Sequence, residues 1–219
     1  MLRYTAELAL SANSAVYRNT DTGYASFRSV LWARLPNAGP PPHFDSIDEY
    51  DAAVQMLRHA GVVLDDGMVY WDVRPSARFP TVEVRVADIP ATVGETVLLA
   101  TLIRACVMTA LDDERRGEPI RPLTSHALKA AYWRSARDGL DGQAVDVESH
   151  QPAPARKLLD RLVNRVRPAL EAVGDYELVR AELDRVTEKG NGAMRQRRVF
   201  QKRGQVADVI AEAATATLT

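Results

Sequence analysis

The chain has 219 residues, 26% of them charged, and its formal net charge at pH 7 is -1. A near-neutral chain of this length can bury a sizeable core as a single domain, and it has no bulk attraction for nucleic acid or an anionic membrane, so neither is an expected partner. Its one cysteine, Cys106, excludes an intrachain disulfide, and its first residues lack a signal-peptide pattern, so we expect a cytoplasmic protein.

Residues 1–45 are rich in Ser, Asn, Gly and Pro, which predicts a strand end at residues 8–10 followed by a long ordered loop. A loop of this length inside a compact domain usually serves a function. Asn13 is either a turn residue or a ligand contact, and the sequence leaves both interpretations open. Arg28, which lies close to two aromatic residues, is the second candidate contact in this loop.

Two Ser/Thr-x-x-Glu sequences predict helix starts. In this pattern the hydroxyl accepts a hydrogen bond from a free backbone N–H of the first turn, and the glutamate side chain reaches back to the backbone N–H of the Ser or Thr. The first begins at Ser46 and predicts a helix that ends at Gly61. The second begins at Thr92 and predicts a helix over about residues 92–111. Apolar residues surround this second helix, so we expect it in the core, packed against the valine face of the preceding strand.

Alternating polar and apolar residues predict two strands, over residues 69–74 and 81–86. Valines would line one face and charged residues the other. A surface strand whose charged face meets only solvent shows the same alternation, so the pattern alone does not distinguish a site from a solvated face. The mixture of charges favours a site for a metal-bound nucleotide phosphate, since carboxylates bind Mg²⁺ and guanidiniums grip phosphate. The charged residues of this stretch are Asp72, Arg74, Arg78, Glu83, Arg85 and Asp88.

The C-terminal half is predicted to be mainly helical. Residues 125–138 form one helix, residues 141–154 form a loop, and two amphipathic helices that end at Gly174 and Gly190 form a helical hairpin. A basic segment at residues 195–203 then leads into an amphipathic tail helix. That segment is either a solvated face or a contact for an anionic ligand.

Five segments are distinctive: LALSANS at 8–14, DTGYASFRS at 21–29, YWDVRPS at 70–76, VEVRVAD at 82–88 and GNGAMRQR at 190–197. Together they resemble the C-terminal portion of glutamate-cysteine ligase family 2, the bacterial carboxylate-amine ligases. A more distant likeness is to glutamine synthetase. The resemblance implies an α+β fold within one domain: part of a glutamine synthetase-like catalytic domain, with an antiparallel sheet segment packed against helices and a helical C-terminal half.

The resemblance also implies a reaction, in which ATP and Mg²⁺ support the joining of a glutamate carboxylate to the amine of cysteine through an acyl phosphate. Amino acids, as small-molecule substrates, would be the ligands. Glu83 would bind the metal, and Arg85 and Arg74 would be catalytic clamps on phosphate or on a substrate carboxylate. The other residues carried over as substrate or nucleotide contacts are Asn13, Arg28, Arg137, Arg195 and Arg197.

The N-terminal half of the family, with an acidic strand whose glutamates bind metal, has no counterpart in this sequence. A sheet edge left without those strands would expose unpaired backbone groups. Three interpretations follow: a truncated enzyme, one piece of a split enzyme that another polypeptide or a homo-oligomer completes, and a noncatalytic partner subunit that keeps the fold.

Overall fold

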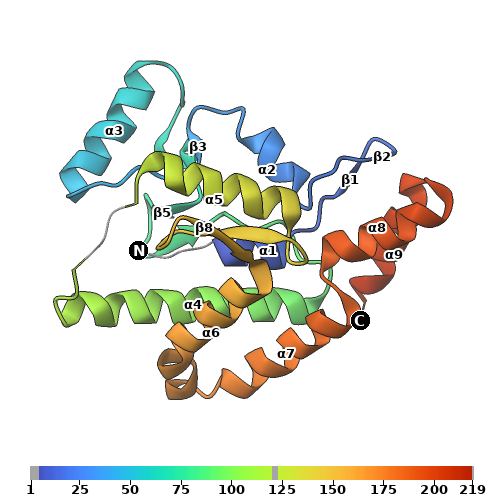
Figure 1. Ribbon diagram of the computed structural model, residues 1–219. Helices are drawn as coiled ribbons and strands as arrows, with labels where there is room; N and C mark the ends of the chain where they lie inside the picture. Colours follow the sequence, from blue (N-terminus) through green and yellow to red (C-terminus); the bar gives the residue numbers. More distant parts are fainter. Residues whose placement is uncertain (1–4, 120–122, 219) are drawn as a thin grey trace.

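The computed structural model of the chain describes residues 5–119 and 123–218. Helices make up most of it, with short strands between them, so the expected α+β class is confirmed (Figure 1). The helices are α1 (Thr5–Ser11), α2 (Phe27–Trp32), α3 (Ile47–His59), α4 (Val93–Arg115), α5 (Ser125–Asp138), α6 (Ala155–Ala172), α7 (Tyr176–Lys189), α8 (Gly192–Arg203) and α9 (Val206–Ala216). The strands are β1 (Val16–Tyr17), β2 (Thr20–Asp21), β3 (Ala38–Gly39), β4 (Tyr70–Trp71), β5 (Val73–Pro75), β6 (Val82–Val84), β7 (Gln143–Asp146) and β8 (Gln151–Pro154).

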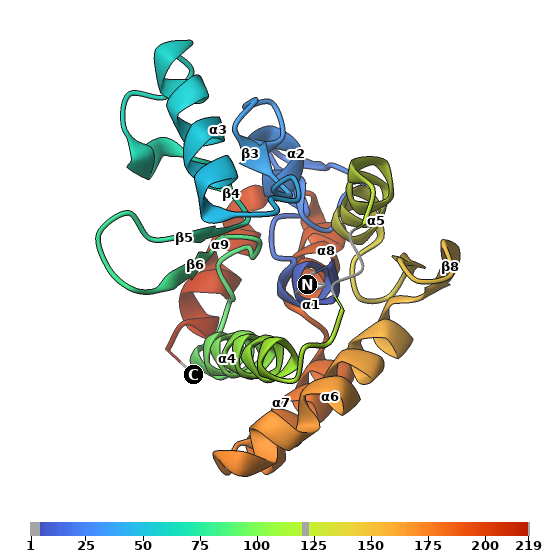
Figure 2. The same cartoon turned by 90° about the vertical axis from the view of Figure 1, so that its left-hand side faces the viewer.

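The main core lies where the long helix α4 packs on α6 and α7, with α1 close by (Figure 2). Leu98 and Leu102 of α4, Val163 and Leu170 of α6, and Val186 of α7 are almost fully buried there. Burying one such side chain stabilises the fold by about 1.5–3 kcal/mol. The main core is therefore built from helices, most of them in the C-terminal half.

The prediction that α4 packs against the valine face of the strand is wrong. Val84 and Val86 instead pack with Leu8 of α1 and Tyr132 of α5. The apolar stripes of the amphipathic helices α6 and α7 cover more of the α4 surface than a short strand can. Val82 of the strand is itself 52% exposed. By length and composition α4 is the one helix within the described ranges that could cross a membrane, but the core helix of a soluble protein passes the same test.

Two other segments differ from the prediction. Residues 8–10 belong to α1 and not to a strand end, because α1 is buried along its whole length and a helix satisfies its backbone hydrogen bonds internally. Residues predicted as the 141–154 loop contain the antiparallel hairpin β7–β8. Its turn is stabilised by the Asp146 carboxylate, which accepts a hydrogen bond from the N–H of Glu148 at 3.0 Å.

The predicted capped helices are confirmed. Ser46 and Thr92 each accept a hydrogen bond at 3.2 Å from the backbone N–H three residues later, at the starts of α3 and α4. α4 continues to Arg115, beyond the predicted end. α5 spans the predicted residues, α6 and α7 form the predicted pair, and the tail helix is α9. The basic segment, to which no helix was assigned, forms most of α8.

The predicted strand pair is present as the antiparallel hairpin β5–β6, in which Val73 pairs with Val84 and Arg74 with Glu83. The strands are shorter than predicted, because β4 pairs in parallel with β3 instead. Asp72 separates β4 from β5, and its backbone N–H donates to the Gly39 carbonyl oxygen at 2.9 Å. The hairpin therefore presents a charged face of a few residues rather than a long polar floor.

Candidate active site

Two arginines enclose one glutamate on hairpin β5–β6. Arg74 stands directly opposite Glu83 in the register, and Glu83 Oε2 accepts a hydrogen bond from Arg74 Nε at 2.9 Å. Arg85 follows Glu83 by two residues, so it lies on the same face, and its Nη1 donates to Glu83 Oε1. The Glu83 side chain is 38% exposed, so this group of three is open to solvent.

The two guanidiniums keep Glu83 ionised. Desolvation would raise the pKa of its carboxyl, but hydrogen bonds from Arg74 and Arg85 hold that pKa below its usual range. Arg74 is fixed further by Nη1, which donates to the carbonyl oxygen of Asp66 at 2.8 Å. Two guanidiniums around one carboxylate leave a net positive charge, which is suited to a phosphate group.

Arg28 reaches the same place from α2. Its Nη2 donates to the carbonyl oxygen of Arg85 at 3.0 Å, and its guanidinium lies 5.9 Å from the centre of the Trp32 ring. The Arg85 guanidinium lies 5.2 Å from the centre of the Tyr70 ring, which contacts Trp32. These cation–π contacts help to hold both guanidiniums in place.

Asp72 lies next to these arginines and is only 2% exposed, and its Oδ2 has no hydrogen-bond partner within the described part of the chain. Burial raises the pKa of its carboxyl from 3.8 to about 7, although the charge of Arg28 opposes the rise. A carboxyl that exchanges its proton near neutral pH is typical of functional sites. We call Arg28, Asp72, Arg74, Glu83 and Arg85 the hairpin cluster.

Asp88 ties the segment that carries Arg28 to the end of the hairpin. Its buried carboxylate accepts hydrogen bonds from the backbone N–H of Asn13 at 2.8 Å and from the hydroxyls of Ser14 and Ser26 at 2.7 and 2.8 Å. Arg28 Nη1 lies 3.8 Å from the same carboxylate. Movement of this segment would break these bonds, so Asp88 fixes the position of Arg28 relative to the strands.

Asn13 is bonded within the protein. Its side-chain nitrogen donates to the carbonyl oxygen of Ile89 at 2.9 Å, and its side-chain oxygen accepts from Gln196 Nε2 of α8 at 3.0 Å. Gly192 permits this approach, because a Cβ at that position would overlap the Asn13 side chain. The structure thus gives Asn13 a structural role, and its role as a substrate contact stays a prediction.

The three other arginines predicted to contact substrate or nucleotide interact with residues outside the hairpin cluster. Arg195 donates from Nη1 and Nη2 to the two carboxylate oxygens of Glu95, at 2.6 and 3.0 Å. Arg197 Nε donates to Asp21, and Arg137 lies over an aromatic ring on its own helix. The structure does not bring these arginines to the cluster, and their roles in binding remain predictions.

The sequence profile of glutamate-cysteine ligase family 2 matches residues 4–212. The chain belongs to this family. It is 71% identical over 211 residues to "Putative glutamate--cysteine ligase 2-2" of Mycolicibacterium vanbaalenii, a match that covers 96% of the chain and 58% of that protein. It is 66% identical to the 2-3 protein of Mycolicibacterium smegmatis, over 96% of the chain and 58% of that protein. For the 2-1 protein of Nocardia farcinica the identity is 54%, over 96% of the chain and 55% of that protein.

This member of glutamate-cysteine ligase family 2 therefore spans little more than half the length of these relatives. Within the described ranges, no group of three or more His, Cys, Asp or Glu side chains could hold a metal ion. Mg²⁺ needs few protein ligands when it arrives with a nucleotide, since one or two carboxylates and the substrate phosphates bind it. Glu83 as the metal ligand stays a prediction: its two oxygens accept hydrogen bonds from Arg74 and Arg85, so a metal would have to displace one of these arginines.

The sequence pattern missed the residues that anchor the site. The sequence analysis counts Asp88 among the charged residues of its stretch but gives it no role, whereas its side chain is 3% exposed and accepts hydrogen bonds from a segment more than sixty residues away. Ser26 and Gln196 were also missed. The available signal was that these residues lie in three of the segments that carry the family resemblance.

Proposed function

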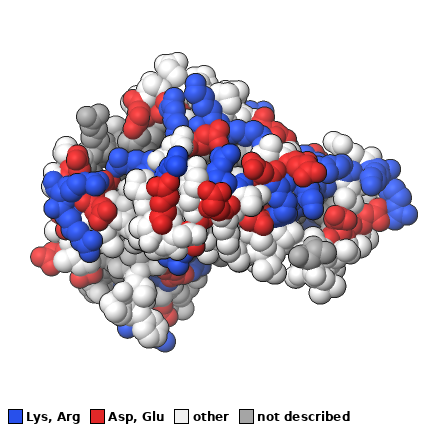
Figure 3. Space-filling model, turned by 90° about the horizontal axis from the view of Figure 1, so that it is seen from below, with Lys and Arg blue, Asp and Glu red and all other residues white. Residues whose placement is uncertain are grey.

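We propose that the chain carries the phosphate-binding arginines of an ATP-dependent carboxylate-amine ligase of the glutamate-cysteine ligase type. The observation that carries this proposal is the convergence of Arg28, Arg74 and Arg85 beside the solvent-open Glu83. Figure 3 shows positive and negative side chains interspersed over the face seen from below. The formal net charge of -1 gives no bulk attraction for an anion, so attraction of an anionic ligand depends on the local arrangement of these arginines.

The proposed reaction forms an amide from an unreactive carboxylate. An oxygen of the glutamate side chain attacks the γ-phosphorus of ATP, the bond to the ADP oxygen breaks, and an acyl phosphate forms. The amine nitrogen of cysteine then attacks the acyl carbon. The carbon–oxygen bond breaks, phosphate leaves with the electron pair, and the nitrogen loses a proton to solvent.

In this proposal Arg74 and Arg85 hold the phosphoryl oxygens and stabilise the charge that develops on them during transfer. Both are already fixed before substrate binds, Arg74 by Asp66 and Arg85 by the ring of Tyr70. Arg28 is the most exposed of the three arginines, which supports its proposed role of binding a substrate carboxylate. Glu83 would hold the Mg²⁺ that arrives with the nucleotide, and the ion would supply neutralising charge for the phosphate oxygens.

A further segment is proposed to complete the site. Each described sheet has only two strands, and an isolated pair of strands is marginally stable in water. The part of the relatives that this chain does not match, on the same or another polypeptide, would add strands to the hairpin in a glutamine synthetase-like sheet and bring more carboxylates. A second copy of this chain would bring no acidic metal cluster among its described residues. The arginine arrangement gives the noncatalytic alternative no specific support.

The proposal is tested by mixing the chain with the portion of the M. vanbaalenii protein that the match leaves uncovered. We expect release of ADP that requires glutamate, cysteine and Mg²⁺. Glu83→Gln is expected to lower the rate on the order of 100-fold, because a carboxylate that positions charge at the transferring phosphoryl group is lost. Glu188→Gln changes an exposed glutamate of α7 and serves as the matched control.

Two results would contradict the proposal. One is an equal rate of ADP release for Glu83→Gln and Glu188→Gln. The other is a folded mixture in which the release of ADP does not depend on the amino acids.

A further inference from the structure

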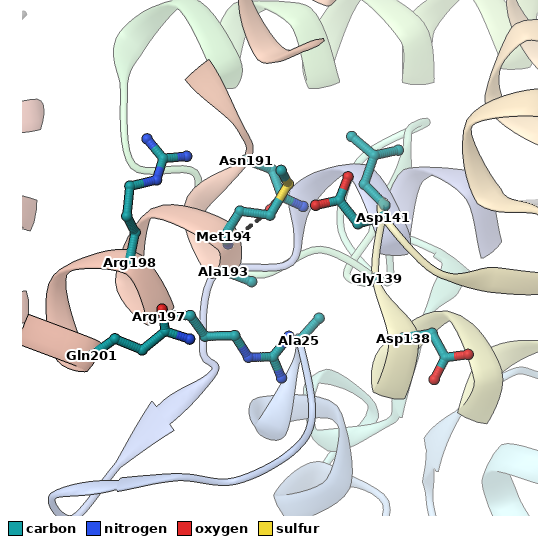
Figure 4. Close-up of a pocket in the computed structure, with 11 residues that line it drawn as sticks. Ala25, Asp138, Gly139, Asp141, Asn191, Ala193, Met194, Arg197, Arg198 and Gln201 are labelled. Atoms are coloured by element: carbon teal, nitrogen blue, oxygen red, sulfur yellow. Dashed lines mark hydrogen bonds between the residues drawn. The ribbon is translucent and has the colours of Figure 1, made fainter. Parts of the chain in front are cut away.

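A cavity of about 320 Å³ lies between the end of α5 and one face of α8 (Figure 4). Its polar side chains are mostly bonded within the chain. Arg197 donates to Asp21, and Asp141 accepts from Arg156, while Figure 4 shows Asp138 directed away from the cavity. A surface that the described residues leave uncovered lies instead on helix α4.

Helix α4 has a buried face and an exposed face, and both are apolar. Leu98 and Leu102 on the inner face are 1% and 0% exposed, in the main core. On the outer face, Val93, Val97 and Leu111 are 60%, 40% and 48% exposed. Only 39% of an eighteen-residue apolar window of this helix is buried. Since a helix that is apolar on all sides is normally buried on all sides, the outer face of α4 calls for a covering element.

The outer face of α4 also differs from that of an ordinary surface helix. In residues 96–111 the only charged residue is Arg104, and its guanidinium pairs with the carboxylate of Asp175 at the start of α7. The exposed residues of α6, in contrast, include several charged ones: Lys157, Asp160, Arg161 and Arg165. The outer face of α6 is therefore suited to solvent, whereas that of α4 has the low charge of an interface core.

The outer residues of α4 have the spacing of a helix-packing seam. They follow one another at alternating intervals of four and three residues, and they are Val93, Val97, Ala100, Arg104, Val107 and Leu111. This is the heptad spacing with which the side chains of one helix insert between those of another. A strand repeats its side chains every two residues and does not match this spacing, so the face fits a helix as the covering element.

We propose that this face of α4 binds an amphipathic helix from the portion of the family relatives that this chain does not match. The match covers 58% of the M. vanbaalenii protein, so about two fifths of that protein lies outside it. Exposed apolar residues also occur between this face and the hairpin β5–β6: Val82 of β6 is 52% exposed, and Ile89, in the connection to α4, is 85% exposed. The same portion would therefore cover the helix face and the hairpin edge together. The inference rests on the further segment proposed above, but not on the reaction assigned to the site.

The seam defines the chemistry of the partner helix. Leucine, isoleucine or valine side chains of that helix would fill the spaces beside Val97 and Ala100, and a polar side chain would lie opposite Arg104. A lipid bilayer is a poorer cover, because insertion of α4 would remove Leu98 and Leu102 from the main core. The same face of a second copy of the chain is the competing occupant, and the experiment separates the two.

The test uses the full chain, co-produced with the portion of the M. vanbaalenii protein that the match leaves uncovered. Val97→Cys places a thiol on the outer face, and the natural Cys106 is only 3% exposed, so a maleimide reports on residue 97. We expect labelling of Val97→Cys to be at least about tenfold slower in the purified complex than in the chain alone, as mass spectrometry of this chain measures. Met56→Cys, at a residue of α3 that is 57% exposed, is the matched control and is expected to react equally in both.

Charged variants test the same face through affinity. Val93→Glu combined with Val97→Glu is expected to leave the chain folded, because both residues are exposed, and to weaken the complex at least about tenfold, because an interface would bury unpaired charges. Met56→Glu is the control and is expected to leave the affinity unchanged. Sedimentation velocity over a dilution series measures the affinity, and circular dichroism checks the folding of each variant.

Four outcomes would overturn the inference. They are no association by the folded chain, equal labelling of Val97→Cys in the complex and in the chain alone, unchanged affinity of the double glutamate variant, and protection of Val97→Cys in a dimer of the chain alone. ADP release by the same complex reports on the proposed reaction separately. Release that depends on the amino acids while Val97→Cys stays reactive would reject only the α4 interface, and protection without release would reject only the reaction.

Discussion

Asp88→Ala is expected to lower the free energy of unfolding by about 3–5 kcal/mol, the usual loss when one member of a buried charged group is removed. The substitution leaves the N–H of Asn13 and the hydroxyls of Ser14 and Ser26 without their acceptor, and it removes the carboxylate beside Arg28. Urea unfolding of the two proteins, followed by circular dichroism, measures the difference.

Asp160→Ala is the matched control for this substitution. Asp160 is exposed on α6, so its replacement is expected to change stability by no more than about 0.5 kcal/mol. A loss below about 1 kcal/mol for Asp88→Ala would contradict the anchoring role that the structure gives to this residue.

A pH-dependent loss of stability is expected from Glu7, which is buried in α1. Burial raises the pKa of its carboxyl from 4.5 to about 7, and Glu7 Oε2 has no hydrogen-bond partner within the described ranges. An acid whose pKa is higher in the folded chain contributes stability that is fully present below its unfolded pKa of 4.5 and is lost as the pH rises through about 7.

Glu7→Gln tests this dependence, because glutamine cannot ionise. The rise of the pKa corresponds to about 3 kcal/mol, so the stability of the variant relative to the unsubstituted chain should increase by about this amount between about pH 4 and pH 8. Asp72 titrates in both proteins and cancels from the difference. Glu188→Gln, at an exposed position, is expected to show a constant difference across the same range. If the difference in the free energy of unfolding were constant with pH for Glu7→Gln as well, ionisation of Glu7 would not destabilise the folded chain.

Local sequence patterns were sufficient to predict those features in which a residue bonds to close neighbours in the sequence. The starts of α3 and α4 follow from Ser46 and Thr92, each of which bonds to a backbone N–H three residues away. The hairpin charges were also predictable, because a strand alternates its side chains and a short turn pairs Arg74 with Glu83.

Distant contacts decided the features that the sequence did not reveal. α1 was predicted as a strand end because its helical form depends on burial among α4, α5 and α6, which come much later in the chain. Whether α4 packs on the strand or on α6 and α7 depended on how well the apolar stripes of these two helices fit the surface of α4. In the sequence Asp88 is one more charged residue of its stretch, and only the fold shows that Ser14 and Ser26 surround it.

Titration calorimetry with a non-hydrolysable ATP analogue and Mg²⁺ tests the nucleotide site most directly. We expect saturable binding to the unsubstituted chain and binding at least about tenfold weaker to Arg85→Ala, which loses a charge-assisted contact with phosphate. Arg78→Ala is the matched control, because Arg78 is an exposed arginine of the loop that joins β5 and β6. Equal affinities for Arg85→Ala and Arg78→Ala, or no binding by the folded chain, would contradict the assignment of the hairpin cluster as a phosphate-binding site.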